Sequence, residues 1–340
     1  MQSSIDLWRS IHGGAFEGVK TLVTGGAGFI GSHIASALAH LGATVVALDD
    51  LSGGGDGDFH GLGPIEFVRG SILDKPLLAR CMQGARYVFH QAALGSVPGS
   101  VKEPVRYFEV NVTGTINVLE AARAAGTQRL LFAASASAYG SSEVLPKVES
   151  MAPEPISPYA ASKVAGEAFL RAYSASYPTL DTAALRYFNI FGPRQNANSA
   201  YAAAIAAFAT AVLAGRRPTI FGDGEQSRDF THVDNVVHAN LLAARAQRPL
   251  RGETINVAVG QRVSVNELVR EIIEFRNRSD LSPIHAPQRA GDVRHSLADI
   301  SRARELLGYE PIVDFRTGLT NTLQWYADQS PHAAQDRSPS

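Results

Sequence analysis

Short apolar runs alternate with longer amphipathic stretches through the first half of the chain. The first run, 21–23, precedes an amphipathic stretch over 29–41 that predicts a helix, and a second apolar run follows at 44–48. The pattern predicts further strands near 66–68, 87–90, 129–134 and 182–186, and further helices near 75–83, 108–125 and 159–176. Near-continuous apolar strands that alternate with helices indicate a parallel sheet covered on both faces. In such sheets, ligands bind beyond the carboxyl ends of the strands.

The regular alternation ends at about residue 190. Beyond it we expect a helix near 201–214, short strands near 218–221 and 255–257, and a helix over 233–246 that returns to the first domain. The expected larger domain is 20–190 plus about 230–255, and the smaller, discontinuous one is about 191–229 plus 256–327. Residues 1–19 form an N-terminal extension, and 328–340 are expected to be a mobile tail. The smaller domain is expected to cover the crevice of the larger one and to bind the substrate.

The composition excludes several classes of protein. With 340 residues the chain is long enough for one large α/β unit and a smaller one. Its net charge of −1, without a basic run, gives no general attraction for nucleic acid or an anionic membrane. Cys81 is the only cysteine, which excludes an intrachain disulfide and a cysteine-based metal cluster, and no metal site is predicted. Because no apolar run reaches membrane-spanning length and the N-terminus does not read as a secretory signal, we expect a cytoplasmic protein.

A glycine-rich turn directly follows the first predicted strand. Gly25, Gly28 and Gly31 let the backbone approach a pyrophosphate at the N-terminus of the next helix. Asp49 ends the second strand, 24 positions after Gly25, where a carboxylate binds the two hydroxyls of an adenosine ribose and repels a 2′-phosphate. These residues favour NAD over NADP and predict a Rossmann-type, doubly wound parallel sheet of the α/β class. A local turn or helix cap is the alternative explanation for Asp49.

A tyrosine and a lysine lie one helical turn apart in the helix predicted near 159–176. Tyr159 and Lys163 are four positions apart, so their side chains share one face of the predicted helix. A cation beside a phenol favours the phenolate and is expected to lower the pKa of Tyr159 toward neutrality. The spacing alone is much more often that of an unrelated Tyr and Lys. Ser135, 24 residues upstream, and the glycine turn make a nucleotide-dependent redox site the better hypothesis.

Several motifs in order give the chain a family resemblance. They are the glycine turn, Gln91-Ala92-Ala93, Asn111, Ser135 and the Tyr-x-x-x-Lys pair, together with the segments 186–189, 222–224, 228–230 and 291–296. Over about 21–325 the chain resembles the extended short-chain dehydrogenases, specifically the nucleotide-sugar epimerases. It is most similar to the UDP-N-acetylglucosamine 4-epimerase branch of the UDP-glucose 4-epimerase family.

The resemblance implies roles for three catalytic residues. Tyr159 acts as base and acid at the sugar 4-hydroxyl, while Lys163 holds the nicotinamide ribose and lowers the pKa of Tyr159. Ser135 forms a hydrogen bond with the reacting oxygen. Hydride leaves C4 for NAD, the resulting 4-keto sugar turns over, and hydride returns to the opposite face. The predicted reaction is reversible C4 epimerisation of a UDP-hexose with NAD that stays bound.

The resemblance also implies the binding residues and a partner subunit. The implied cofactor residues are Gly25, Gly28, Phe29, Ile30, Gly31, Asp49, Ser71, Ile72, Gln91, Ala92, Ala93, Asn111, Tyr159, Lys163 and Tyr187. The implied substrate residues are Ser96, Ser135, Ser137, Tyr159, Asn189, Gln195, Arg228, Arg289 and Ser296. The helices near 108–125 and 159–176 are expected to build a homodimer through a four-helix bundle.

Three positions refine the expected chemistry. By the resemblance, Ser296 stands where epimerases restricted to plain hexoses carry a bulky Tyr, so the pocket has room for an N-acetyl group. UDP-GlcNAc and UDP-GalNAc are the expected substrates, and UDP-Glc and UDP-Gal are expected to be accepted more weakly. Ala136-Ser137 follows Ser135 where related dehydratases carry an acidic pair, which disfavours loss of the C6 hydroxyl. Ser71 stands where many relatives carry an Asp that contacts adenine, so NAD affinity is expected to fall somewhat.

Two alternatives remain at this point. A 4-epimerase of UDP-glucuronic acid, or of an N-acetylhexosaminuronic acid, would need a cation or hydroxyls for the C6 carboxylate, and Arg194 or Ser96 could contribute them. A non-catalytic NAD-binding scaffold would keep the glycine turn, yet it has no chemical need for Ser135, Tyr159 and Lys163 together.

Overall fold

The computed structural model describes residues 2–53, 59–196, 204–288 and 293–329, with side chains from Ile5 onward. Most of the expected tail, 330–340, lies outside the described residues. Seven of the strands form one parallel sheet in the order β11-β6-β5-β4-β1-β2-β3. Their bounds are β1 Lys20–Thr24, β2 Thr44–Asp49, β3 Ile65–Arg69, β4 Tyr87–His90, β5 Arg129–Ser135, β6 Asp181–Tyr187 and β11 Glu253–Val257. The predicted Rossmann-type sheet is confirmed.

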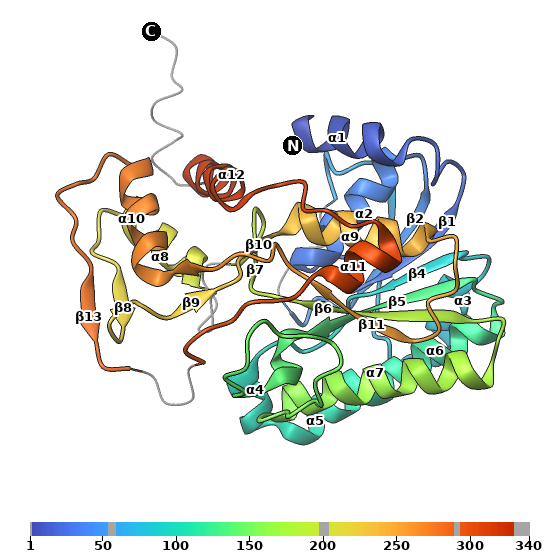
Figure 1. Cartoon of the computed structure of the whole chain (residues 1–340). Helices are drawn as coiled ribbons and strands as arrows, with labels where there is room; N and C mark the ends of the chain where they lie inside the picture. The colour runs from blue at the N-terminus through green and yellow to red at the C-terminus, as the bar shows by residue number, and fades with distance from the viewer. Residues whose placement is uncertain (1, 54–58, 197–203, 289–292, 330–340) are drawn as a thin grey trace, which may run out of the picture.

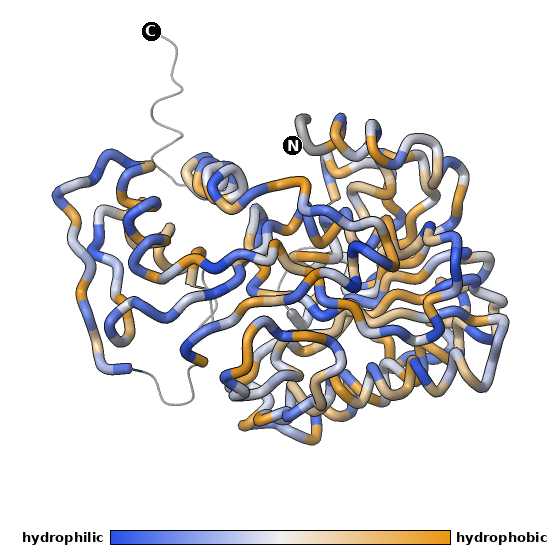
Figure 2. The backbone as a smooth tube through the Cα atoms, in the orientation of Figure 1, coloured by the Kyte–Doolittle hydropathy of each residue, from blue (hydrophilic) through white to orange (hydrophobic). Residues whose placement is uncertain are grey.

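Helices cover both faces of this sheet (Figure 1). One face carries α1 Gln2–His12, α2 Phe29–His40, α9 Val233–Arg245 and α11 Ser301–Leu307. The other carries α3 Lys75–Met82, α6 Gly114–Ala124 and α7 Pro158–Ser176. Each layer has its own apolar core against the sheet. The inner strands are apolar along both faces because both faces are buried, whereas the edge strand β3 is only partly buried. Figure 2 shows much of the tube in the region of the large sheet in orange, the colour of hydrophobic residues.

A smaller lobe lies beside the carboxyl ends of the central strands (Figure 1). It is built from α8 Ala204–Leu213, α10 Val265–Phe275 and α12 Phe315–Asp328, which share one apolar core. Its short strands pair as β8 Thr219–Phe221 with β13 Ile284–Ala286, and β9 Ser227–Arg228 with β12 Val263–Ser264. A third pair, β7 Ile190–Phe191 with β10 Thr231–His232, leads back into α9. The division into two domains at the expected residues stays a prediction.

Side-chain caps explain where several helices begin. Asp74 accepts a hydrogen bond from Leu77 N at 3.0 Å at the start of α3. Ser157 accepts one from Ala160 N at 3.1 Å at the start of α7, with Pro158 in the first turn. These oxygens satisfy backbone donors that a helix leaves free at its N-terminus, so each helix starts at a defined residue. The boundary of α7 in turn sets the height of Tyr159 above the sheet.

Two sequence-based expectations need correction, and one short helix was not expected. The helix predicted over 108–125 is divided into α5 Pro104–Phe108, a π-helical turn at Glu109–Thr113 and α6. A further short helix, α4 Val97–Lys102, precedes α5. The strand near 255–257 is part of β11 at the edge of the large sheet, beside β6, so a boundary at residue 256 would cut through a strand of that sheet.

The N-terminal extension, for which the sequence predicted no structure, forms a helix that packs on the larger domain. Its helix α1 lies against α2 and α9, and Trp8 and Phe16 are buried there. His12 Nε2 lies 3.2 Å from Nδ1 of His238 on α9. Burial lowers the pKa of His12 to about 3 and that of His238 to about 4, so both rings are neutral at pH 7. The extension therefore adds a buried layer to the larger domain.

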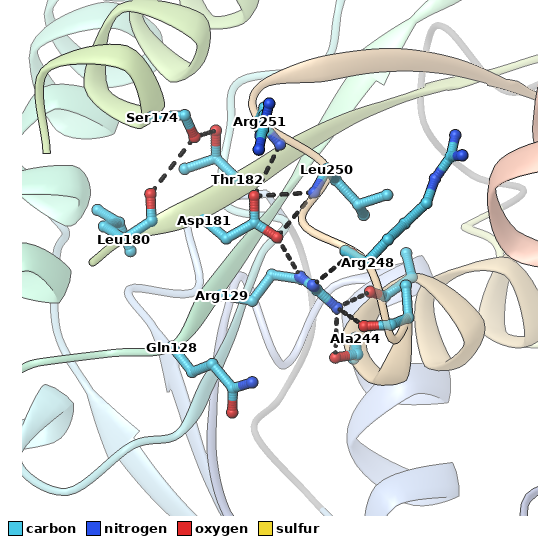
Figure 3. Close-up of polar contacts among 12 residues, drawn as sticks. Gln128, Arg129, Ser174, Leu180, Asp181, Thr182, Ala244, Arg248, Leu250 and Arg251 are labelled. Carbon is cyan, nitrogen blue, oxygen red and sulfur yellow. Dashed lines mark hydrogen bonds and ion pairs between the residues drawn. The ribbon is translucent and has the colours of Figure 1, made fainter. Parts of the chain in front are cut away.

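At the amino ends of β5 and β6, a buried ion pair fixes α9 to the sheet (Figure 3). Arg129 Nε donates to Asp181 Oδ2 at 2.7 Å, while Nη1 donates to the carbonyls of Ala243, Ala244 and Ala246 at 2.8–3.0 Å. The guanidinium thus satisfies carbonyls that the end of a helix leaves free.

No helix of the described ranges is long and apolar enough to cross a membrane.

Candidate active site

The turn between β1 and α2 forms a backbone cradle. Gly25 has φ +67°, and a Cβ there would lie 2.6 Å from the backbone N of Ala92. A Cβ on Gly31 would collide with the carbonyl of Gly25. Gly28 precedes α2 without any side-chain cap, so the first N–H groups of the helix face the turn. Such an end binds an anion, and the cradle fits the pyrophosphate of a dinucleotide.

Asp49 lies next to this cradle at the end of β2. Its Oδ2 accepts a hydrogen bond from Ala27 N at 3.0 Å and its Oδ1 accepts one from Leu51 N at 2.8 Å. Burial raises the pKa of Asp49, and the two N–H donors oppose the rise. The carboxylate therefore does stabilise the local turn, and Asp49 also lines the neighbouring pocket.

One pocket brings together eight of the predicted cofactor residues. Besides Leu48, Asp50, Ser52, Gly53, Gly70, Leu94 and Val110, it is lined by Gly25, Gly28, Asp49, Ser71, Ile72, Gln91, Ala92 and Ala93. Phe29, Ile30 and Gly31 form the first turn of α2 beside it. Ser71 Oγ accepts a hydrogen bond from Leu73 N at 3.2 Å, so this hydroxyl serves the turn before α3. A glycine turn beside a carboxylate at the end of the second strand is typical of a site for the adenosine end of a dinucleotide.

Asn111 lies in the π-helical turn and braces the loop that lines this pocket. Its Oδ1 accepts from Leu94 N at 2.8 Å, and its Nδ2 donates to Leu94 O at 3.1 Å and Ser162 Oγ at 3.0 Å. The wider turn places this side chain between the loop after β4 and α7. π-Helical turns inside α-helices often occur at functional sites.

Ser135, Tyr159 and Lys163 meet at the carboxyl end of β5. Ser135 ends that strand, and its hydroxyl forms a hydrogen bond with the phenol of Tyr159. Ser137 Oγ donates to Ser135 Oγ at 2.9 Å. Lys163 is buried, and its Nζ donates to Ala133 O at 2.8 Å. The three predicted catalytic side chains therefore share one corner, with Ser137 as a fourth member.

The electrostatics of this corner differ from the expectation. Burial raises the pKa of the Tyr159 phenol, and the hydrogen bond with Ser135 opposes that rise. Lys163 does not lower it here, because Nζ lies 5.9 Å from the centre of the Tyr159 ring and donates to a carbonyl. Burial also lowers the pKa of Lys163 to about 8, opposed by Glu167. In the protein alone, the pair is thus a neutral phenol beside a weakened cation.

Glu167, one turn beyond Lys163, holds α7 against β6. Its carboxylate accepts from Arg186 Nε at 2.8 Å and from Nη2 at 2.7 Å, and the guanidinium lies 4.6 Å from the centre of the Tyr139 ring. Glu167 has no role among the sequence-based predictions, although Arg186 belongs to the 186–189 motif. The signal was the spacing of four residues between Lys163 and Glu167, which places both on one helix face.

A second pocket lies in the smaller lobe. It is lined by Asn189, Ile190, Phe191, Ala204, Ile205, Ala207, Phe208, Thr219, Phe221, Gln226, Arg228, Phe230 and Val265. Arg228 Nη1 donates to Ser227 O at 3.0 Å and Arg294 O at 3.2 Å, which holds the guanidinium at the pocket wall. Asn189 Nδ2 donates to Asp229 O at 3.2 Å. Aromatic walls with one cation fit a flat base attached to phosphate.

Asp229 organises the backbone behind Asn189 and Arg228. Its buried carboxylate accepts from the backbone N–H groups of Val259, Gly260 and Ala298 at 3.0–3.2 Å. Burial raises its pKa to about 6, and these donors oppose the rise. The sequence analysis quoted Asp229 within the 228–230 motif and gave it no role.

The remaining predicted substrate residues are dispersed. Ser96 caps α4 by accepting from Gly99 N at 3.0 Å, and Gln195 Nε2 donates to Ile190 O at 3.0 Å. Ser296 N donates to Ser227 O at 3.0 Å, so Ser296 lies beside the strand that carries Arg228. Arg289 lies outside the described residues. Arg194, considered for a uronic acid, packs with its Nε 3.2 Å from His33 Nε2 on α2.

Tyr187, the last predicted cofactor residue, lies buried at the end of β6. Its hydroxyl donates to Gln91 Oε1 at 3.2 Å and accepts from Asn240 Nδ2 at 2.9 Å. Tyr187 therefore reaches the pocket through Gln91.

Comparison with known proteins agrees with this site. The model of the NAD dependent epimerase/dehydratase family matches residues 21–258. The chain is 40% identical to the UDP-glucose 4-epimerase of Mycolicibacterium smegmatis, over 92% of this chain and 100% of that one. The chain therefore belongs to the NAD-dependent epimerase/dehydratase family. Within it, this is an NAD-dependent enzyme of the UDP-sugar 4-epimerase type.

Two solved structures show the same fold with different sugar nucleotides. One is the UDP-N-acetylglucosamine 4-epimerase of Methanobrevibacter ruminantium in complex with UDP-N-acetylmuramic acid, with a TM-score of 0.86 and 38% identity, covering 92% of this chain and 100% of that one. The other is a UDP-glucuronic acid 4-epimerase mutant from Bacillus cereus with a fluorinated UDP-glucuronic acid and NAD, with a TM-score of 0.84 and 28% identity, covering 92% and 100%. Membership in this group of enzymes rules out the alternative of a non-catalytic NAD-binding scaffold. Its relatives act on more than one UDP-sugar, so the family alone does not identify the sugar.

Proposed function

We propose that this enzyme reversibly inverts C4 of UDP-N-acetylglucosamine and UDP-N-acetylgalactosamine, and accepts UDP-glucose and UDP-galactose less well. The observation that carries the chemistry is the hydrogen bond between Ser135 and Tyr159 at the carboxyl end of β5, beside buried Lys163. A phenol with a hydroxyl partner is a suitable base and acid for a secondary alcohol. Bound NAD would supply the hydride acceptor and return the hydride in the second half of the reaction.

The residues of this corner divide the proton transfer between them. Tyr159 takes the proton of the sugar 4-hydroxyl and later gives it back, while Ser135 orients the same oxygen. Since burial raises the pKa of Tyr159, a positive charge nearby is needed to favour the phenolate. Oxidised nicotinamide carries such a charge, and Lys163 at its ribose would add a second. This coupling predicts a lower pKa for Tyr159 in the enzyme with oxidised NAD.

The absence of an acid beside Ser135 supports epimerisation over elimination. The turn after Ser135, Ala136–Tyr139, has Ala136 and Ser137 next to the reacting position, and Ser137 donates to Ser135. Loss of the C6 hydroxyl as water needs a proton donor at that oxygen. A serine hydroxyl is too weak an acid for this step, so the keto sugar is reduced again.

The nucleotide is proposed to bind in the pocket of the smaller lobe. Arg228 provides a cation for the diphosphate, Asn189 provides an amide, and Phe191, Phe208 and Phe230 provide apolar walls for the uracil. Arg289 is proposed as a second cation on the diphosphate. Because the net charge of the chain is −1, affinity for a dianion depends on such local groups.

Ser296 is proposed to decide which sugar is accepted. It is half-buried beside Ser227, and its small side chain leaves space for a 2-acetamido group. The test is a panel of UDP-GlcNAc, UDP-GalNAc, UDP-Glc, UDP-Gal and UDP-GlcA, with wild-type enzyme and Ser296→Tyr. We expect conversion of the acetamido sugars to be fastest and to be lost selectively in Ser296→Tyr. Equal loss on both types of sugar would contradict the role of Ser296.

A uronic acid is the second candidate substrate, favoured by the relatives that act on UDP-glucuronate. Ser96 offers a hydroxyl for a C6 carboxylate, whereas the Ser137 hydroxyl already donates to Ser135 and Arg194 is held against His33. Preferential conversion of UDP-GlcA in the same panel would establish this candidate in place of the first.

The homodimer and the cytoplasmic location remain proposals. Apolar side chains of α4 and α5, namely Val101, Val105 and Phe108, are 64%, 80% and 60% exposed beside α7. A second copy of this chain would bury them in a four-helix bundle. Val105→Glu should shift the mass in solution toward a monomer, while Val144→Glu, at a loop position that is 64% exposed, should leave it unchanged.

A further inference from the structure

A chain of three side chains connects α9 with the pocket that we assign to NAD. Asn240 is fully buried on α9, and its Nδ2 donates to Val236 O at 2.8 Å and to the hydroxyl of Tyr187 at 2.9 Å. That hydroxyl donates to Gln91 Oε1 at 3.2 Å, and Gln91 lines the pocket.

The geometry gives this chain a single direction. The carbonyl of Val236 only accepts hydrogen bonds, so the NH2 group of Asn240 must face it and Tyr187. The Tyr187 oxygen therefore accepts, and its proton is directed to Gln91. The atom of Gln91 that receives this proton must be the amide oxygen. The NH2 group of Gln91 is thereby turned the other way.

The turned NH2 group has no protein partner. Gln91 Nε2 is buried and has no hydrogen-bond partner among the residues that the structure describes, and the same holds for Asn240 Oδ1. Buried amide groups without partners lower stability, so this arrangement is not explained by stability. It is explained if the orientation of Gln91 serves a ligand.

We propose that Asn240 is a positioning residue, which acts through Tyr187 to hold the Gln91 amide as a donor to an acceptor oxygen of NAD. The inference rests on the proposed placement of NAD in this pocket. An amide donor fits a phosphate, ribose or carboxamide oxygen. Asn240 itself does not line the pocket and touches no substrate.

The readout is the rate at which purified enzyme loses NAD during dilution, measured by NAD content per chain and not by activity. We expect Gln91→Leu and Asn240→Leu each to speed this release about fivefold, the effect of one hydrogen bond. Asn240→Asp should act similarly, because a carboxylate would accept the Tyr187 proton and leave Gln91 free to rotate.

The double variant separates positioning from general loosening of the core. If Asn240 acts through Gln91, Asn240→Leu combined with Gln91→Leu releases NAD no faster than Gln91→Leu alone. Multiplied effects would overturn the proposal. Asn235→Leu is the matched control, since Asn235 is equally buried on α9 and bonds Val313 and Ile312 instead. It should lower thermal stability and leave the release rate unchanged.

Asp49→Ala tests the placement of NAD separately. If it speeds release and the Asn240 variants do not, only the positioning role is wrong. If Asp49→Ala has no effect either, the placement itself is wrong.

Discussion

The two ends of β5 and β6 use buried polar side chains in opposite ways. At the amino ends, Arg129 and Asp181 are completely engaged: Arg129 bonds Asp181 and the last carbonyls of α9, and Asp181 also accepts from Leu250 N and Arg251 N at 2.7–3.0 Å (Figure 3). At the carboxyl ends, the polar groups are less completely bonded. Burial raises the pKa of Tyr159, the partner of Ser135, and it raises the pKa of Tyr187 to about 12. The amide nitrogen of Gln91, which bonds Tyr187 through its oxygen, has no hydrogen-bond partner among the described residues.

The difference shows how one pair of strands separates stability from function. A buried ion pair is favourable only when further hydrogen bonds satisfy both charges, and the amino ends meet this condition. At the carboxyl ends, the Gln91 amide is held in an orientation that leaves its buried NH2 group without a hydrogen-bond partner among the described residues. Parallel sheets bind ligands at that edge, which agrees with the proposed role of the Gln91 amide as a donor to the cofactor.

The largest effect is expected from Tyr159→Phe. Removing the phenol hydroxyl removes the proposed base and acid and should lower kcat about 10²- to 10⁴-fold. NAD content and melting temperature should stay near wild type, because the ring is retained. Tyr177→Phe, at the other end of α7, is the control and should keep full activity. Near-normal epimerisation by Tyr159→Phe would sink the assignment of this corner.

Arg129→Met should show the opposite behaviour at the other end of the same strand. It leaves Asp181 charged and partly buried and frees the last carbonyls of α9, which should cost about 3–5 kcal/mol of stability. The kcat of the molecules that remain folded should be unchanged. Urea unfolding and turnover measured on one preparation test both statements. Arg123→Met removes an exposed ion pair with Glu120 and should hardly change stability.

Much of the larger domain was predictable because its inner strands are apolar on both faces and some of its helices, α3 and α7 among them, begin at ordinary caps. The glycine turn, Asp49, Ser135, Tyr159 and Lys163 were predictable because their spacing reflects one helical turn and the ends of successive strands. Their roles at the site remain predictions. The helix division at Asn111 was missed, because a π-helical turn leaves the hydrophobic period of the helix almost unchanged.

Other features depend on contacts between distant parts of the chain. The pKa of Tyr159 follows from burial and from where Lys163 Nζ points, and neither is written in a spacing of four residues. Asn240 reads as an ordinary helix residue until Tyr187 and Gln91 are placed beside it. The N-terminal extension has no motif or long apolar run that predicts a partner, so the packing of α1 on α9 follows only from the fold.

Lys163→Met should lower the epimerase activity and raise the free energy of unfolding. Burial lowers the pKa of Lys163 from 10.5 to about 8, so the unfolded chain binds this proton more tightly than the folded protein. The loss of folding stability that comes from burying protonated Lys163 is complete below about pH 8, and it disappears as the pH rises from about 8 to about 10.5. At pH 7 the variant, without NAD, should therefore be about 1–3 kcal/mol more stable than wild type, after the lost bond to Ala133.

The pH profile checks the cause of this gain. The difference in unfolding free energy between wild type and Lys163→Met should shrink between pH 8 and 10. A difference that stays constant over this range would show that packing, and not the buried charge, is responsible. Arg129→Met should give such a constant difference over the same range, because an arginine keeps its proton there.

The smallest effect is expected from Ser71→Asp, which adds an acceptor at the ligand edge. Ser71 Oγ accepts from Leu73 N at 3.2 Å, and an aspartate can keep this contact while its second oxygen faces the pocket. A hydrogen bond to the adenine amino group should slow NAD release about two- to tenfold. Ser71→Ala, which adds no acceptor, should release NAD at the wild-type rate. If Ser71→Asp instead raised the melting temperature of the protein alone and left NAD release unchanged, this edge would be serving the fold, and the contrast between the two ends of the sheet would fail at this residue.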